Sequence, residues 1–517
     1  MLALYVFLRI LLFNVNKTEI GDSFNLITAA ESINRGTYPV EEKRMPFYPL
    51  LLAGGISKVD PVFWGRFLSL ILSLGILYLS TRIGEKLGIK NSFLILIPIL
   101  IAINPLFSYW SIRIMSDLLF LLIIELVLYF LLFFNKNSIL FAILMGFLGG
   151  LAILTRFEGG LLVLLIMVTM FWRTRSIKWS IIAGTASFLT IFPWLYRNYL
   201  LFHNPFHTAY TQEAKGYLPD INSLGSFGVY ALFLLGPLTP VFLLEGLKTA
   251  WDEKTKGWLP LLLSGVFFYP VICYWTAALP RLFLLVLPLT AILVVKGFER
   301  FELRAQWNSM LLSSIVWGLG VMLLPSEFLR GSMGGFILIS AVTGICLALM
   351  KYKFPNRALQ LSLIILIFSQ LVTSISVIVR ARDRSSTTLK AALYAQNLSG
   401  PVGYADETGV SSWYLRHNGK YWDGDTGFLE TMYWFNDEKI KYVLVTNEHD
   451  EEGAQFYVVT DWEEKHHFKK LVEFSREQSI DPFNKFFNKI LGRVSQASAI
   501  KHSEVYEVLS YKPRNPH

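Results

Sequence analysis

Long runs without a charged side chain are the feature that most limits what this chain can fold into. Stretches free of Asp, Glu, Lys and Arg occupy 92–112, 257–280, 305–326, 331–350 and 358–379. Each is close to the roughly 20 residues that a helix needs to cross the hydrocarbon core of a bilayer. Shorter apolar runs occupy 63–81, 118–134, 138–155, 159–172, 179–196, 225–247 and 282–295. With an N-terminal anchor at 1–13, they predict an α-helical polytopic membrane protein of about 12–13 transmembrane helices.

The charge balance fits a membrane protein better than a nucleic-acid-binding protein. The chain is 53% hydrophobic and has a formal net charge of +9. The excess Lys and Arg lie in short loops between apolar runs, and they do not alternate with aromatic residues as in a single-strand binding surface. We therefore expect contacts with membrane lipids and no nucleic-acid partner.

The distribution of basic residues between alternate loops predicts the orientation. Lys and Arg cluster near 82–90, 173–178, 248–256, 296–304 and 351–357. The short loops of the other set carry single arginines, Arg113, Arg156, Arg281 and Arg330. Basic loops favour the cytoplasmic side. The first loop, residues 14–62, and the tail from 381 are therefore predicted to lie on the extracytoplasmic side of the cell membrane.

The tail has a different composition, with many charged residues and no long apolar run. Strands are predicted at 401–405, 441–446 and 504–509, and helical stretches at 386–397 and 481–491. These features indicate a small extracytoplasmic α/β domain over 381–517 that follows a transmembrane domain over 1–380.

The first outer loop contains a carboxylate at a predicted helix start. From Asp22 onward, apolar residues recur at helical spacing, and Gly36 precedes a turn at 37–39. Asp22 can simply cap this helix, because a carboxylate at a helix N-terminus accepts backbone hydrogen bonds and is favoured by the helix dipole. It can also act as a base or a metal ligand. The two interpretations are compatible.

Further ionisable residues lie at predicted helix ends. Asp117 can form a helical ion pair with Arg113, four residues earlier, or belong to a polar site. Glu158 can pair with Arg156. Glu125 falls within a predicted span, where we expect a protonated or hydrogen-bonded structural side chain.

Several short motifs, in order, resemble a known family. They are Asp22 with Gly36-Thr37-Tyr38-Pro39 and Pro46-Phe47-Tyr48-Pro49-Leu50, Met115-Ser116-Asp117-Leu118, the segment Leu151–Gly159 around Thr155-Arg156, Pro193–Tyr199 followed by His203-Asn204-Pro205-Phe206, and Pro280-Arg281-Leu282. Over residues 1–300 the chain resembles the GT-C glycosyltransferases, which include protein O-mannosyltransferases and the lipid A aminoarabinose transferase. Ser23 stands where the mannosyltransferases often have a second acid.

The resemblance implies an inverting transfer of a sugar from a polyprenyl-phosphate-linked donor to a lipid, glycan or protein acceptor. It implies catalytic roles for Asp22 and Asp117, and donor-phosphate binding by Arg156 and Arg281. Arginine suits the latter role because it grips phosphate oxygens bidentately and stays charged. A divalent cation, Mg²⁺ or Mn²⁺, on Asp22 and Asp117 is a further possibility. Substrate contacts are expected from Glu31, Tyr48, Glu158, Arg197, His203 and His207.

Two other classes of membrane protein remain open at this point. A secondary transporter or lipid flippase would place its ionisable residues near the middle of the membrane and often shows two similar halves. Here the candidate residues gather at one predicted edge, Glu125 excepted. An oligosaccharide ligase or polymerase is also multispanning and would use a pyrophosphate-linked donor.

Overall fold

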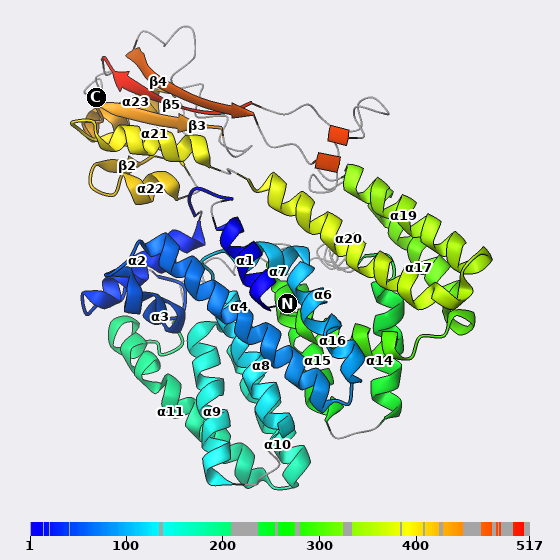
Figure 1. Cartoon of the computed structure of the whole chain (residues 1–517). Coiled ribbons are helices and arrows are strands. Elements are labelled where there is room, and N and C mark those ends of the chain that lie inside the picture. The colour runs from blue at the N-terminus through cyan, green and yellow to red at the C-terminus, as the bar shows by residue number, and fades with distance from the viewer. Residues whose placement is uncertain are drawn as a thin grey trace. The chain divides into compact units, whose positions relative to one another are not determined.

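A computed structural model gives the positions of most of the chain (Figure 1). It describes residues 2–13, 15–19, 21–40, 42–133, 138–207, 236–253, 257–274, 280–323, 333–382, 385–406, 409–422, 428–447, 467–477, 482–483, 485–486 and 500–510. Parts of the predicted runs 225–247, 257–280, 305–326 and 331–350, and most of the predicted helix at 481–491, lie outside these ranges.

The chain divides into two compact units. The first comprises 1–9, 29–378 and 482–495, and the second comprises 10–28, 379–481 and 496–517. The chain passes from one to the other at 378/379, close to the predicted boundary at 380/381. The grouping of 10–28 with the tail was not predicted, and it means that Asp22 belongs to the second unit.

The first unit is helical. Its elements, with the helices that cross into the second unit, are α1 (Leu2–Leu12), α2 (Asp22–Asn34), α3 (Phe47–Ile56), α4 (Pro61–Lys86), α5 (Asn91–Leu94), α6 (Leu96–Ile103), α7 (Pro105–Trp110), α8 (Asp117–Phe133), α9 (Ile139–Thr155), α10 (Gly159–Thr174), α11 (Ile177–Phe202), α14 (Thr239–Asp252), α15 (Trp258–Tyr274), η1 (Pro280–Val286), α16 (Leu287–Glu299), α17 (Leu303–Leu323), α19 (Met333–Tyr352), η2 (Pro355–Arg357) and α20 (Ala358–Arg380). Every predicted apolar run contains at least part of a helix.

Among the described residues, five helical segments are long and apolar enough to cross a membrane. They are Pro61–Lys86, Ile177–Phe202, Arg281–Glu299, Gly334–Tyr352 and Pro355–Val379. Shorter apolar helices, such as Ile139–Thr155 and Gly159–Thr174, accompany them. The chain is therefore a polytopic helical membrane protein, as its apolar runs predicted.

The run 92–112 is broken into α5, α6 and α7 instead of forming the predicted single span. Asn104 is extended at the junction of α6 and α7, its side chain accepts a hydrogen bond from the Leu106 amide, and Pro105 opens α7. The buried Arg9 donates to the Ala102 carbonyl at 2.7 Å and to the Ser108 carbonyl at 2.9 Å. These bonds satisfy backbone groups that the break would otherwise leave without partners.

Small residues bring two pairs of helices close together. A Cβ at Gly146 in α9 would lie 2.1 Å from the Ala183 carbonyl oxygen of α11, and the Ser187 hydroxyl of α11 donates to the Gly146 carbonyl at 2.8 Å. A Cβ at Gly246 in α14 would lie 1.9 Å from the Leu293 carbonyl oxygen of α16. Within a lipid bilayer the hydrophobic effect does not drive helices together, and close backbone contact at small residues is one way in which they associate.

The second unit contains a five-stranded mixed sheet, and this confirms the predicted small sheet domain. Its elements are α21 (Ser386–Gln396), β1 (Val402–Tyr404), α22 (Val410–Tyr414), β2 (Gly419–Tyr421), α23 (Phe428–Asp437), β3 (Tyr442–Thr446), β4 (Phe468–Glu477) and β5 (Ile500–Val508), in the sheet order β2-β1-β3-β5-β4. Strand β1 is parallel to β2 and β3, and β5 is antiparallel to β3 and β4.

Apolar residues cover both faces of this sheet. Along β3, Val443 and Val445 pack in a cluster with Phe435 of α23, whereas Leu444 packs in another with Ala391 and Ala392 of α21. Successive strand residues point to opposite faces, so one strand contributes to both clusters. This arrangement explains why the strand has the unbroken apolar run Val443-Leu444-Val445 instead of an alternating pattern.

Candidate functional site

Three predicted site residues form one cluster in the first unit. The Arg156 guanidinium donates to Asp117 Oδ1 at 2.8 Å, and to Glu158 Oε1 at 2.8 Å and Oε2 at 3.3 Å. The Asp117 side chain is 1% exposed, and those of Arg156 and Glu158 are 16% and 17% exposed. Arg156 therefore links two carboxylates and joins the start of α8 to the turn between α9 and α10.

The local sequence explains this turn. Helix α9 ends at Thr155, Arg156 is extended, and α10 begins at Gly159. A Cβ at Gly159 would lie 2.3 Å from the carbonyl carbon of Ala152, so the close return of the chain requires glycine. Phe157, between Arg156 and Glu158, is 41% exposed. The two residues that bond to each other, Arg156 and Glu158, thus flank an exposed side chain.

Arg281 belongs to the same region. It lies in η1, its guanidinium is 5.8 Å from the centre of the Trp110 ring, and its Nη1 is 4.0 Å from the Met115 sulfur. Burial raises the pKa of the Glu158 carboxyl, but the charge and hydrogen bonds of Arg156, aided by the charge of Arg281, outweigh burial and lower this pKa. Arg156 therefore bonds to both Asp117 and Glu158, and the charge of Arg281 also acts on Glu158.

The charges of this cluster balance. Asp117 and Glu158 are acids, and Arg156 and Arg281 are bases, so the four ionised side chains sum to zero. Asp117 Oδ2 is buried and has no hydrogen-bond partner among the described residues. The start of α8 stabilises the Asp117 carboxylate through the helix dipole. Of the two alternatives for Asp117, the structure favours the polar site: Asp117 pairs with Arg156, and Arg113 precedes α8.

Asp22 is the first residue of α2 and is half-buried, within the second unit. Gly21 before it has a φ of +54°, and Gly36 after the helix has a φ of +78°. The helix start at Asp22 and its end before Gly36 agree with the prediction. The side chain of Ser23, the next residue, donates to the buried Glu19 carboxylate at 3.1 Å.

Glu31 and Tyr48 lie on α2 and α3. Glu31 pairs with Arg35 at 3.9 Å on the same helix, where the Arg35 side chain is 76% exposed. Tyr48 is fully buried in α3. Its burial favours a packing role for the ring.

Arg197, His203 and His207 gather around the end of α11. Arg197 donates to the Tyr38 carbonyl at 3.1 Å and lies over the Tyr38 and Trp194 rings. His203 has a left-handed conformation at the C-terminus of the helix, and His207 stacks on Phe202 at 3.8 Å. The helix ends before Pro205, so the two histidines do not share a helical face, as the sequence indicated.

Among the described residues, no three His, Cys, Asp or Glu side chains form a metal-binding group. The carboxylates of Asp117 and Glu158 neutralise a guanidinium as they are arranged. The described residues of the first unit therefore do not form a cation site by themselves. The cation on Asp22 and Asp117 stays a prediction, and no chemical step is derived through it.

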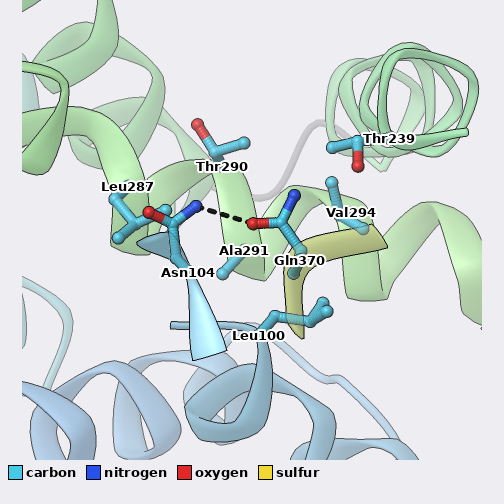
Figure 2. A pocket seen from close by; sticks show the side chains of 8 residues that line it. All are labelled: Leu100, Asn104, Thr239, Leu287, Thr290, Ala291, Val294 and Gln370. Carbon is cyan, nitrogen blue, oxygen red and sulfur yellow. Dashed lines mark hydrogen bonds between the residues drawn. The ribbon is translucent and has the colours of Figure 1, made fainter. Parts of the chain in front are cut away.

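Two features of this unit were not predicted. Trp110, under Arg281, ends the short helix α7. A pocket lies between α6, α14, α16 and α20, where the Asn104 amide donates to the Gln370 carbonyl oxygen at 3.0 Å among Leu100, Leu287 and Val294 (Figure 2). None of the predicted site residues lines this pocket.

Glu125 accepts a hydrogen bond from Ser80 at 3.2 Å, which fits the predicted structural role.

The comparisons with known proteins place this fold. No protein-family model matches the sequence, and no curated protein matches it. The structure is similar to that of ArnT from Cupriavidus metallidurans in the apo state, with a TM-score of 0.60, 14% identity and 99% of each chain covered. It is also similar to that ArnT bound to undecaprenyl phosphate, with a TM-score of 0.59, 14% identity and 97% of each chain covered. The chain therefore has the same fold as ArnT.

Proposed function

We propose that this protein transfers a sugar from a polyprenyl-phosphate-linked donor to an acceptor on the extracytoplasmic face, with inversion at the anomeric carbon. The observation that carries the proposal is the cluster of Asp117, Arg156, Glu158 and Arg281 on a fold shared with an ArnT that binds undecaprenyl phosphate. Lipid, glycan and protein acceptors all fit the proposal.

The two arginines supply the charge that a lipid phosphate needs. A polyprenyl tail keeps its phosphate at the level of the lipid headgroups, where a guanidinium can bind two phosphate oxygens at once. When the sugar leaves, the phosphate gains negative charge, and fixed cations stabilise the transition state. Arg281 is held over Trp110, and Arg156 is held by two carboxylates, so both guanidinium groups are oriented before the donor binds.

Asp22 is the proposed base. Inverting transfer requires one group to take the proton of the acceptor hydroxyl while the phosphate leaves. The motif order assigns this role to Asp22, and the start of α2 stabilises its ionised form. Asp117, bonded to Arg156, would orient that guanidinium and would not take the proton itself.

The test is turnover of labelled polyprenyl-phosphate sugars by the purified full-length protein in detergent. Release of free lipid phosphate together with a glycosylated acceptor is the expected result. Movement of the labelled lipid across vesicles without any covalent product would instead show a transporter or flippase. Turnover only with a pyrophosphate-linked donor would show a ligase or polymerase.

Chelation tests the predicted divalent cation. If Mg²⁺ or Mn²⁺ is required, EDTA will abolish turnover, and addition of either ion will restore it. The donor-binding constant measured in the same EDTA solution separates the possible roles, because a cation on the phosphate will also weaken binding. Full turnover after dialysis against EDTA would remove the cation from the proposal.

A further inference from the structure

Phe24, two residues after Asp22, packs against α22 in the same unit. The Phe24 side chain is 3% exposed, and its ring stacks on Trp413 with centroids 5.4 Å apart and planes at 23°. Tyr414 meets the same ring edge-on at 6.3 Å. Both aromatic residues belong to α22, nearly four hundred residues further along the chain.

Helix α22 is itself held in place at its start. Asp406 follows β1, is 3% exposed, and its carboxylate accepts a hydrogen bond from the Ser411 amide at 2.7 Å. Gly409 has a φ of +75°, a conformation that residues with a Cβ rarely adopt. The Asp406–Ser411 bond and Gly409 therefore fix the start of the helix that carries Trp413.

Gly409 also lies close to the backbone just before Asp22. A Cβ built on Gly409 would lie 3.6 Å from Phe24 Cδ2 and 3.7 Å from the Gly21 nitrogen. On the other side of Asp22, the buried Ser23 hydroxyl donates to Glu19 at 3.1 Å. The Phe24 amide donates to the Gly21 carbonyl at 3.1 Å. Asp22 thus lies between residues that are fixed on both sides.

We propose that Trp413 is a positioning residue for Asp22: through its stack with Phe24, it fixes the start of α2 and hence the direction of the carboxylate. This inference rests on the proposed function, in which Asp22 is the base. A base misplaced by about 1 Å can cost on the order of 10²-fold in rate. The tail of the chain, through Trp413, would then contribute to the chemical step, in addition to any contact with the acceptor.

The test compares three variants of the full-length protein. Trp413→Ala removes the ring, Trp413→Phe keeps an aromatic ring at the same place, and Trp434→Ala is the matched control. Trp434 is a half-buried tryptophan of the same unit whose ring lies 5.7 Å from that of Phe435. We expect Trp413→Ala to lower kcat by about 10- to 100-fold with the donor KM unchanged, because its contacts involve the base and not the phosphate site.

Two further results are expected. Trp413→Phe retains most of the activity, and hydrogen exchange of the amides of residues 21–28 becomes faster in Trp413→Ala but not in Trp434→Ala. Wild-type kcat in Trp413→Ala would overturn the inference. An equal loss of kcat in Trp434→Ala would also overturn it, because general destabilisation of the unit would then explain the effect.

If the proposed function is wrong, the variants give a different set of results from those expected if the positioning role is wrong. Full turnover by Asp22→Asn would refute Asp22 as the base, whatever the Trp413 variants do. The exchange measurement needs no turnover, so it still reports whether Trp413 orders the segment. Unchanged exchange at 21–28 in Trp413→Ala would overturn the positioning role even if Asp22 is essential.

Discussion

Asp22 and Asp117 are each the first residue of a helix, but they differ in burial and in the contacts around them. Asp117 is 1% exposed and bonded to Arg156 at 2.8 Å in the first unit. Asp22 is half-buried in the second unit, next to a segment held by Phe24 and Trp413. The local sequence signal is the same in both, an acid that opens an apolar helix.

The difference shows what a helix-opening acid can do in each setting. A buried carboxylate that bonds to a guanidinium fixes the position of that guanidinium. Asp117 is therefore suited to hold Arg156. Asp22 lies on a segment whose neighbour Phe24 stacks on Trp413, and the function proposed above uses its carboxylate as the base.

The largest expected effect comes from removing the carboxylate of Asp22. Asp22→Asn keeps the size and shape of the side chain and should lower kcat by about 10²–10⁴-fold, the usual contribution of a placed general base. The unfolding temperature in detergent should stay close to that of the wild type. The matched variant Asp117→Asn should retain more kcat. The reverse order would exchange the roles of the two acids.

The next effect is on stability, and it comes from Arg156. Arg156→Ala leaves Asp117 buried without its partner, which typically costs about 3–5 kcal/mol of unfolding free energy. The double variant Arg156→Ala/Asp117→Asn should recover part of this loss, because the buried Asp117 carboxylate is gone while Glu158 still lacks its partner. Thermal unfolding in one detergent measures both. Arg35→Ala, which breaks an exposed pair with Glu31, is the control and should cost under about 1 kcal/mol.

The helices and the sheet domain could be predicted from the sequence because their patterns are local. The break between α6 and α7 was missed, although Asn104-Pro105 carries a capping residue followed by the proline that often opens a helix. Strand β4 was also missed. Its sequence is rich in Lys and Glu, as edge strands often are, and it lies at one edge of the sheet.

The candidate site was harder to predict, because its bonds join distant parts of the chain. Asp117 was given Arg113 as a possible partner by helical spacing, but its partner is Arg156, 39 residues away. The contact of Phe24 with Trp413 had no signal in the sequence. Single residues could be selected by type and by position near a predicted helix end. Their pairing depends on how the helices pack, which one sequence does not reveal.

A smaller effect should distinguish Arg281 from the arginines of the basic loops. Arg281→Ala should raise the donor KM about tenfold or more, since a hydrogen bond to a charged group contributes about 1.5–3 kcal/mol. Arg281→Lys should recover only part of this, because an ammonium group lacks the paired donors of guanidinium. Arg300→Ala, which removes an exposed partner of Glu253, is the control. An unchanged donor KM in Arg281→Ala would exclude Arg281 from phosphate binding.

The smallest expected effect is a pH dependence of the unfolding temperature that involves Glu158, which shares Arg156 with Asp117. Arg156 lowers the pKa of Glu158 despite its burial. A lowered pKa in the folded protein means that the ion pair contributes its full stability above the ordinary Glu value of about 4.3, and loses it as pH falls through the lower folded value. The difference in unfolding temperature between wild type and Glu158→Gln should therefore be constant near neutral pH and shrink below about pH 4. A difference that stays the same at acidic pH would show that Glu158 does not depend on Arg156 for its ionisation, and the cluster around Asp117 would then reduce to a single ion pair.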